Sequence, residues 1–202
     1  MTTGDLARSR RRMAVATQLP NVLTYLRIAA VPALVSCFFL VRGDLSYWLA
    51  VGIFVAAAIT DFFDGYLARA WKQQSSLGRM LDPIADKLLV ATSLLLMVER
   101  GIIGDWSTWA AVVILCREIL VSGLREFLAE LQVSVPVTQL AKWKTTLQLI
   151  AIGILLSGPA GDKLVSGMQT MGLACLWVSA IVTLYTGYDY FRAGVHHLID
   201  ED

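Results

Sequence analysis

Two pairs of aspartates stand close together in the sequence and carry its clearest chemistry. Asp61 and Asp64 are three residues apart, and Asp82 and Asp86 are four apart, so each pair lies on one face if its segment is helical. Acids inside apolar segments are costly and are therefore candidate functional residues. Two such pairs facing each other would form an oxygen-rich site for hard divalent cations. We predict that these four residues, the motif aspartates, hold two divalent cations, Mg²⁺ or Mn²⁺, for displacement at a phosphate.

Small residues and an arginine follow the first aspartate pair at helical spacing. Gly65 and Ala68 lie four and seven residues after Asp61, so they place a small-residue patch on the same helical face. Such a patch would let a nucleotide approach the helix backbone without meeting a side chain. Arg69, one residue further along, is placed to bind a phosphate oxygen. Gly78 is expected to provide a turn in the polar loop before the second aspartate pair.

The fixed residues between Asp61 and Asp86 read D-x2-D-G-x2-A-R-x8-G-x3-D-x3-D. This pattern resembles the signature of the CDP-alcohol phosphotransferase family at every fixed position. The resemblance implies an integral membrane enzyme that transfers a phosphatidyl-type group from a CDP-linked lipid to an alcohol and releases CMP. It also favours Asp86, the last aspartate of the pattern, as the general base that accepts a proton from the acceptor hydroxyl.

A polar stripe enters the first apolar segment of the chain. Asn21, Thr24 and Arg27 recur every three residues, so on a helix they share one face. Arg27 alone could direct its guanidinium to the membrane surface, but the other two polar residues favour a binding role. The run NVLTYLR also resembles the N-terminal element of the family, which lines the nucleotide pocket. The resemblance thus implies a CDP-lipid site made of Asn21, Thr24, Arg27, Asp61, Gly65, Ala68, Arg69 and Gly78.

Basic residues recur in two later apolar segments. Arg117 and Arg125 are eight residues apart and point roughly the same way on a helix, and Lys142 and Lys144 lie about a turn inside the next segment. Arg117 could instead join an ion-pair network: it is not expected to pair with the adjacent Glu118 on one face, but each could bond a neighbouring helix. The two lysines could simply anchor their segment at the membrane surface. Together, the four basic residues favour a pocket for an anionic second substrate.

Two runs of the chain narrow the choice of acceptor. Residues 116–130, CREILVSGLREFLAE, and 135–148, VPVTQLAKWKTTLQ, resemble those of the bacterial phosphatidylglycerophosphate synthases within the family. The resemblance implies CDP-diacylglycerol as the donor and sn-glycerol 3-phosphate as the acceptor. An inositol phosphate acceptor would need the same basic charges and stays open as an alternative. A neutral acceptor such as serine or inositol would leave the buried positive charge unpaired.

The composition indicates a membrane protein. Of the 202 residues, 56% are hydrophobic and 16% charged, and the mean hydropathy is +0.62; soluble domains have about 25% charged residues. The net charge of +1 gives no case for nucleic acid as a partner. Cys37, Cys116 and Cys175 are far apart in apolar runs, so we expect them to pack and to form no zinc site. The polar, basic start of the chain predicts no cleavable signal peptide.

The apolar runs predict an all-α integral membrane protein with six transmembrane helices. The predicted spans are 21–41, 47–71, 82–97, 106–130, 136–156 and 168–190. The basic segment 1–20 is expected to be a disordered tail or a short interfacial helix on anionic lipid. We expect one domain over 1–202, with the helix bundle at 21–193 and a polar tail at 194–202.

The spans place the acids at an interface and suggest close helix contacts. One aspartate pair falls at the end of the second span and the other at the start of the third, joined by a polar loop at 72–80. Asp82 followed by Pro83 could also be an ordinary helix start. Glycines in and beside the last span, at Gly167, Gly172 and Gly187, are expected to allow neighbouring helices to approach closely.

The distribution of basic residues predicts the topology. Only Arg42, Arg100 and Lys163 fall in the expected outer loops, whereas the other 14 of the 17 basic residues fall in the tails, the inner loops or the inner parts of the spans. Both termini and the acid site are therefore expected to face the cytoplasm. The resemblance places the protein in the bacterial cytoplasmic membrane, among membrane lipids, and implies a homodimer.

Internal carboxylates also occur in transporters and channels, where they bind a travelling ion. Transporter sites usually lie at the middle of the membrane on broken helices, often within inverted repeats. The motif aspartates instead lie near the inner ends of two consecutive spans, and the chain shows no internal repeat. An inactive family member kept as a scaffold is a further alternative, which the complete motif disfavours.

Overall fold

The structure of the chain is a computed structural model that describes residues 19–71, 76–131 and 139–199. Within these ranges, side chains are described for residues 22–61, 78, 80–129, 131 and 143–192. The described residues form helices and short connections and contain no strand. The helices are α2 (Leu19–Leu40), α3 (Asp44–Trp71), α4 (Ser76–Glu99), α5 (Ser107–Glu130), α6 (Gln139–Leu156), α7 (Gly158–Leu164) and α8 (Met168–Ile199).

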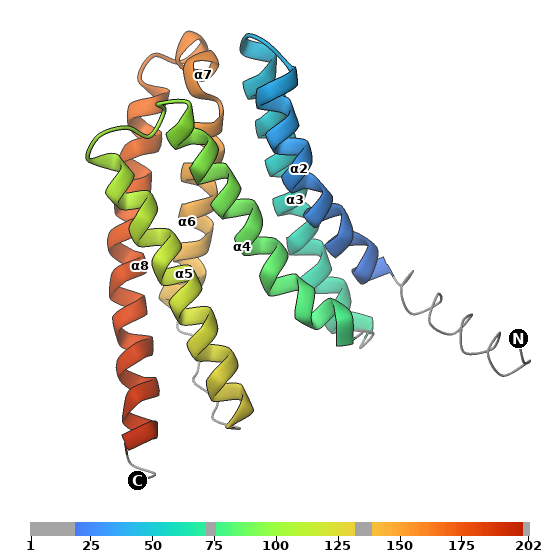
Figure 1. Cartoon of the computed structure of the whole chain (residues 1–202), viewed down its shortest axis with the longest axis vertical. Helices are drawn as coiled ribbons and strands as arrows, with labels where there is room; N and C mark the ends of the chain where they lie inside the picture. Colours follow the sequence, from blue (N-terminus) through green and yellow to red (C-terminus); the bar gives the residue numbers. More distant parts are fainter. Residues whose placement is uncertain (1–18, 72–75, 132–138, 200–202) are drawn as a thin grey trace, which may run out of the picture.

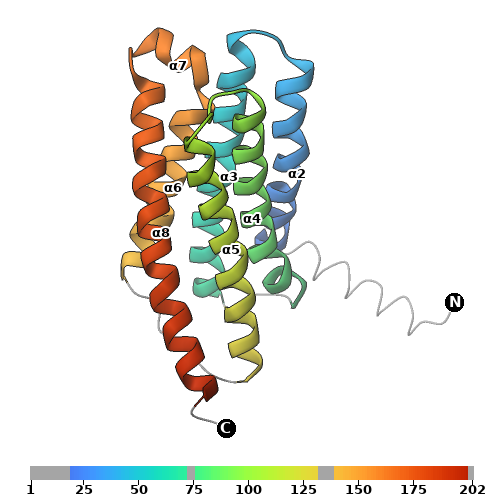
Figure 2. The ribbon, with the colours of Figure 1, turned by 60° about the vertical axis from the view of Figure 1, so that its left-hand side comes forward.

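The long helices run side by side, and each runs opposite to the one before it along the chain (Figure 1, Figure 2). The short helix α7 lies at one end of the bundle, together with the turn at 41–43 and the connection at 100–106. We call this the α7 end. The opposite end, which we call the site end, holds the last residues of α3 and α5 and the first residues of α4 and α6. The order of the predicted spans therefore gives an up-and-down bundle.

Apolar side chains fill the space between the helices. α2 packs on α3 and α4, α8 packs on α5 and α6, and contacts of α6 with α3 and α4 join these two groups. Leu34, Phe54, Leu94, Ile114 and Leu155 contribute to the core, and each is at most 1% exposed. Burial of such side chains stabilises each by roughly 1.5–3 kcal/mol relative to exposure in water. The core holds the helix ends that carry the polar residues in a fixed register.

Large apolar side chains also cover the outside of the bundle, among them Leu40, Leu120 and Ile181, which are 79%, 70% and 62% exposed. An apolar surface of this extent suits lipid rather than water. Within the described chain, four helices contain segments long and apolar enough to cross a membrane: Val22–Leu40, Asp44–Asp61, Ser107–Ala129 and Met168–Arg192. α6 and α7 would supply a fifth, bent by 84°. The prediction of an all-helical membrane protein is confirmed, with four or five helices that meet this criterion.

Helix α4 is the predicted span that does not meet this criterion at all, whereas α6 meets it only together with α7. The 24 residues of α4 extend about 36 Å, which is long enough to cross a membrane. Arg79, Asp82, Asp86 and Lys87 all lie in its first half, so no sufficiently long part of it is apolar enough. α4 nevertheless lies alongside α2 within the bundle (Figure 1). Its charges therefore belong to a packed helix and not to a surface loop.

The predicted polar loop at 72–80 is too long. α4 begins at Ser76, so Gly78 is helical and buried and does not provide the expected turn. Asp82 and Pro83 likewise lie inside α4 and do not form its start. The run SLGRML at the start of α4 is rich in good helix formers. A proline costs a helix one backbone hydrogen bond, and α4 continues through it.

Two of the three glycines expected at helix contacts lie at such contacts. A Cβ atom on Gly172 would lie 2.8 Å from Leu155 Cδ2 on α6, and one on Gly187 would lie 3.0 Å from Arg117 Cγ on α5. Only glycine lets these helices pack so closely. The prediction is wrong for Gly167, which has a φ of +85° in the turn before α8 and no atom within 4 Å of an added Cβ. Its role is to allow the left-handed turn.

Two chain segments are more helical than predicted. The expected outer loop at 157–167 contains α7, whose first residues include Pro159, a favourable residue at a helix start. The last helix was expected to end near residue 190 but continues to Ile199. Residues 194–199 of the expected polar tail therefore have a helical backbone.

Candidate functional site

A cavity of about 680 Å³ lies between α3, α4, α5 and α6, in the half of the bundle nearer the site end. Its charged lining comprises Asp61, Asp82, Asp86, Lys87, Arg117, Glu118, Arg125 and Lys144. The structure therefore brings three of the four motif aspartates into one cavity with three of the four basic residues predicted for the acceptor. We call the side formed by α3 and α4 the acid wall, and the side formed by α5 and α6 the basic wall.

The acid wall is supported from behind by α2. Arg27 Nη1 lies 2.8 Å from Asp61 Oδ1, and the hydroxyl of Thr24 donates a hydrogen bond to Asp82 Oδ1. Thr24 and Arg27 are each 1% exposed, so Arg27 does not extend to the membrane surface. Thr24 and Arg27 of the polar stripe face the acids because α2 packs on both acid-bearing helices. These contacts orient two carboxylates toward the cavity in the way that outer partners orient metal ligands.

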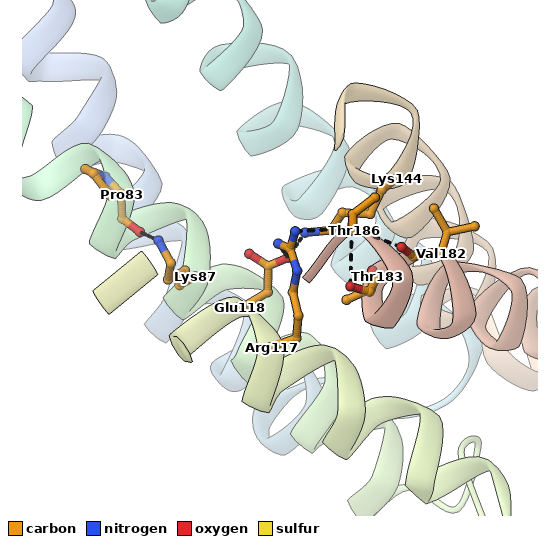
Figure 3. Close-up of polar contacts among 8 residues, drawn as sticks. All are labelled: Pro83, Lys87, Arg117, Glu118, Lys144, Val182, Thr183 and Thr186. Atoms are coloured by element: carbon orange, nitrogen blue, oxygen red, sulfur yellow. Dashed lines mark hydrogen bonds and ion pairs between the residues drawn. The ribbon is translucent and has the colours of Figure 1, made fainter. Parts of the chain in front are cut away.

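The basic wall is a network that joins three helices (Figure 3). Lys144 Nζ on α6 donates a hydrogen bond to Glu118 Oε1 on α5, and Arg117 Nη1 lies 3.5 Å from the same oxygen. Arg117 Nη2 also donates to Thr186 Oγ1 on α8, at 3.2 Å. The expected bonds to neighbouring helices are present. The expectation that Arg117 would not pair with Glu118 is wrong, because the long guanidinium side chain reaches the carboxylate of its neighbour.

The other basic residues predicted for the acceptor lie on α5 and α6. Arg125 lies two turns beyond Arg117 on α5, and its Cζ lies 5.7 Å from the centre of the Tyr190 ring on α8, a cation–π contact. Lys144 is 4% exposed, so it does not anchor α6 at the membrane surface. The side chain of Lys142 lies outside the described residues.

Part of the predicted donor and metal site lies at positions of α2 and α3 whose side chains are outside the described residues. These positions are Asn21 on α2 and Asp64, Gly65, Ala68 and Arg69 on α3. Their helical backbone keeps Asp64, Gly65 and Ala68 near the face of α3 that carries Asp61. Among the described side chains, no three His, Cys, Asp or Glu gather closely enough to hold a metal ion. Asp64, the remaining motif aspartate, is not among those side chains.

Several cavity residues were not predicted from the sequence. Lys87 lines the acid wall, and its Nζ donates a hydrogen bond to the Pro83 carbonyl at 3.0 Å. Its position directly after Asp86 was the available signal. Thr145 and Thr146 line the basic wall next to Lys144. Their neighbour in sequence was predicted, but nothing in the pattern distinguished them from ordinary helix residues.

Buried polar groups also lie on α6 and α8, away from the cavity lining. Gln148, Ser179 and Thr183 are at most 3% exposed. Gln148 Oε1, Ser179 Oγ and Thr183 Oγ1 have no hydrogen-bond partner within the described part of the chain. Such groups are costly in an apolar interior. They add buried polar character to α6, which is part of the basic wall, and to α8, which packs behind it.

The chain is similar in sequence to a known family and to named proteins over most of its length. A family model described as CDP-alcohol phosphatidyltransferase matches residues 17–185. A protein of Rickettsia bellii is 46% identical over 181 residues, which cover 90% of this chain and 97% of that protein. Relatives from Cereibacter sphaeroides and Pectobacterium atrosepticum are 39% and 40% identical, over 91% and 90% of this chain and 98% and 97% of their own. All three are named CDP-diacylglycerol–glycerol-3-phosphate 3-phosphatidyltransferase.

Proposed function

Because the chain belongs to the CDP-alcohol phosphatidyltransferase family, we propose that it transfers the phosphatidyl group of CDP-diacylglycerol to sn-glycerol 3-phosphate and releases CMP. It is then a transferase of phospholipid biosynthesis. The relatives that carry the name of this reaction match nearly their whole length to this chain. The proposal therefore concerns the whole chain and not one part of it.

The observation that carries the proposal is the pairing of opposite charges across one cavity. The acid wall offers carboxylates, and the basic wall offers guanidinium and ammonium groups. A reaction between two phosphate-bearing substrates needs both, because one wall must hold cations for the pyrophosphate and the other must hold the acceptor phosphate. The outer surface of the bundle is apolar, so the lipid tails of the donor can stay in the membrane beside it while its headgroup enters the cavity.

The acid wall suits the divalent cations on which members of this family generally depend. We propose that the motif aspartates hold two of them, Mg²⁺ or Mn²⁺, since carboxylate oxygens are their preferred ligands. When bound, such cations supply positive charge beside the donor phosphates. Arg27 and Thr24 fix the carboxylates of Asp61 and Asp82 from behind. These two contacts keep the carboxylates aimed at the cavity.

The donor is proposed to lie along the acid wall, between the polar stripe of α2 and the small-residue face of α3. Its binding residues would be Asn21, Thr24, Arg27, Asp61, Gly65, Ala68, Arg69 and Gly78. Gly65 and Ala68 would let the nucleotide approach the backbone of α3. Gly78 is buried on α4, so its contribution rests on its small size and not on a turn.

In the proposed step, a hydroxyl oxygen of the acceptor forms a bond to the phosphorus that carries diacylglycerol. The bond from that phosphorus to the bridging oxygen breaks, and CMP leaves with this oxygen. Asp86, which lines the cavity from α4, accepts the hydroxyl proton. The acceptor phosphate is held by Arg117, Arg125, Lys142 and Lys144. Positioning and charge neutralisation then contribute most of the rate, as in phosphoryl transfer generally.

Two candidate acceptors, glycerol 3-phosphate and an inositol phosphate, carry a phosphate that suits the basic wall. Glycerol 3-phosphate is favoured because the relatives are named for it. An inositol phosphate would present the same phosphate to Arg117 and Lys144, so it is the second candidate. A neutral alcohol is disfavoured, because the described cations of the basic wall outnumber Glu118, the carboxylate paired with two of them, and a neutral acceptor would supply no further anion.

We propose that all six long helices cross the membrane, with α4 as the polar span, and that the site end faces the cytoplasm of a bacterial cell. The basic residues support this orientation, since few of them lie toward the α7 end. The bundle at 21–193 is proposed to be a single domain within residues 1–202. The family resemblance further suggests a homodimer, which chemical cross-linking of the protein in lipid bilayers would test.

The test of the reaction is an acceptor panel. Purified protein receives CDP-diacylglycerol and Mg²⁺, and CMP release is followed with glycerol 3-phosphate, inositol 1-phosphate, inositol or serine. We expect release with glycerol 3-phosphate only, and loss of release when a chelator removes divalent cations. Release with inositol 1-phosphate alone would change the acceptor and keep the site. No release with any acceptor would contradict the proposed reaction.

A further inference from the structure

Glu118 differs from the other acids of the cavity because its described partners are two cations that themselves line the cavity, whereas the described partner of Asp61 is Arg27, behind the acid wall. Its Oε1 accepts a hydrogen bond from Lys144 Nζ and lies 3.5 Å from Arg117 Nη1. It belongs to the basic wall, whereas the motif aspartates lie on α3 and α4. Neither the sequence motif nor the proposed reaction gives Glu118 a task.

The two cations need an anionic partner. The side chains of Lys144 and Arg117 are 4% and 13% exposed. A charge buried to this degree is costly unless it is paired and hydrogen-bonded. Glu118 is the carboxylate that pairs with both, and it reaches them from the same helix turn as Arg117. It therefore fixes where both positive charges lie before any substrate binds.

This pairing leaves donors for a ligand. Lys144 has three N–H donors and Arg117 has five. Lys144 donates one of them to Glu118, and Arg117 uses its two terminal nitrogens for Glu118 and Thr186. Arg117 Nε is buried against Gly187 of α8, so the donors left for a ligand are the other N–H groups of Lys144 Nζ and of the two terminal nitrogens of Arg117. Because both side chains line the cavity, Glu118 can stay bonded to them while an acceptor phosphate uses the other donors.

We propose that Glu118 is a positioning residue for the acceptor: it holds Lys144 and Arg117 in the orientation that binds the acceptor phosphate. The inference rests on the proposed function and adds a residue to its acceptor site. The charges of the basic wall agree with it. Among the described residues of this wall, Arg117, Arg125 and Lys144 contribute three positive charges and Glu118 one negative charge, which leaves two; the side chain of Lys142 is outside this count. A phosphate monoester dianion neutralises two charges, whereas a phosphodiester neutralises one.

The test replaces the carboxylate by its amide. In Glu118→Gln, Lys144 loses its charged partner while the shape of the side chain is kept. We expect the KM for glycerol 3-phosphate to rise about tenfold, the effect of one lost charge-assisted hydrogen bond. The KM for CDP-diacylglycerol should stay unchanged, because the donor lies along the acid wall. Glu126→Gln is the matched control, since Glu126 lies two turns along α5, is exposed and does not line the cavity.

A second measurement does not depend on turnover. Inorganic phosphate should raise the Tm of the wild-type protein by binding to the basic wall. The phosphate concentration that gives half of this rise should be about tenfold higher in Glu118→Gln, for the same reason. If the wild type bound phosphate but released no CMP with any acceptor, the proposed reaction would be wrong. The Tm measurement would still test whether Glu118 positions the basic wall for phosphate.

A double variant separates positioning from a general structural effect. If Glu118 acts through Lys144, then Glu118→Gln should raise the KM little further once Lys144→Met is present. If Glu118→Gln does not fold, Glu118→Asp is the second variant, because its shorter side chain keeps the charge but moves it away from Lys144 and Arg117. We expect this small displacement to raise the KM for glycerol 3-phosphate about threefold. The proposal is overturned if the folded variants change neither the KM for glycerol 3-phosphate nor the phosphate concentration that gives half of the Tm rise, or if they lower that KM. It is also overturned if Glu118→Gln has the same effect as Glu126→Gln, or if its effect adds fully to that of Lys144→Met.

Discussion

Asp86 and Glu118 are carboxylates of the same cavity with different surroundings. Glu118 is engaged by two cations of the basic wall and is therefore suited to hold them in place. Asp86 reaches the cavity from α4, on the wall that carries Asp61 and Asp82. In the proposed reaction this is where donor and acceptor meet. The same functional group thus has two proposed tasks, which follow from the helix that presents it.

Replacing Asp86 tests its role as the proton acceptor. Asp86→Asn keeps the size of the side chain and removes its ability to take a proton. We expect CMP release to fall by about 100-fold or more, the usual contribution of a general base. The rate of CMP release with saturating substrates measures this, and an unchanged Tm shows that the variant is folded. A variant that kept at least half of the wild-type rate would contradict the assignment.

The hydrogen bond from Thr24 to Asp82 offers a second test at the scale of one atom. Thr24→Val replaces the hydroxyl by a methyl group of similar size and leaves Asp82 without this donor. We expect kcat/KM for CDP-diacylglycerol to fall about tenfold, as for a lost hydrogen bond to a charged group. Thr60→Val is the control, because Thr60 bonds the Ala56 carbonyl of its own helix. Equal effects of the two substitutions would remove Thr24 from the donor site.

At the scale of helices, the contact between α5 and α8, which we call the seam, fixes the position of Arg117, a residue of the proposed acceptor site. α5 packs on α8, and the close approach at Gly187 lets the Arg117 side chain lie against the α8 backbone. Thr186, the residue before this glycine, accepts a hydrogen bond from the same guanidinium. α8 therefore supplies both the space and one fixed partner for Arg117, although none of its described side chains lines the cavity.

An added methyl group in this seam should affect the acceptor alone. In Gly187→Ala the new Cβ would lie 3.0 Å from Arg117 Cγ and 3.3 Å from Arg117 Nε, so the arginine must shift by a few tenths of an ångström. We expect the KM for glycerol 3-phosphate to rise about threefold, since small misplacements of binding groups reduce catalysis. Steady-state kinetics with each substrate varied in turn measure this. Gly153→Ala on α6, where no atom lies within 4 Å of the new Cβ, should leave both KM values unchanged.

At the scale of the whole molecule, the bundle separates two chemical environments. The acid and basic walls lie toward the site end, and the apolar outer surface extends along the helices. A reaction between a lipid-anchored donor and a water-soluble acceptor needs such an arrangement. The polar character of α4 follows from it, because a helix that presents acids and a lysine to the cavity cannot also be apolar throughout its length.

The crossing of α4 can be tested by labelling cysteines from one side. In a protein whose native cysteines are replaced by alanine, Gly104→Cys lies in the connection at the α7 end and Leu131→Cys at the site end. If α4 and α5 both cross, a membrane-impermeant maleimide added to intact spheroplasts should label Gly104→Cys, and Leu131→Cys only after lysis. Labelling of neither position in intact spheroplasts would contradict the six-span topology.

The sequence by itself determined the class of the protein and the residue types of its site. Apolar runs of membrane-spanning length predict helices wherever they occur, because each helix satisfies its own backbone hydrogen bonds. The spacing of the motif aspartates within two such helices was sufficient to place them on shared faces. The basic residues of α5 and α6 were recognised from their charge in an apolar setting. These are local properties, and they depend on neighbours within a few residues.

Only the tertiary structure decided which residues of different helices meet. The contacts of Thr24 with Asp82, of Glu118 with Lys144 and of Arg117 with Thr186 join positions that are 58, 26 and 69 residues apart. They depend on which helices are neighbours and on the register in which those helices pack. No single segment specifies that register, since it results from the fit of the whole apolar core. For the same reason, the early start of α4 and the place of Glu118 between two cations could not be predicted from local pattern.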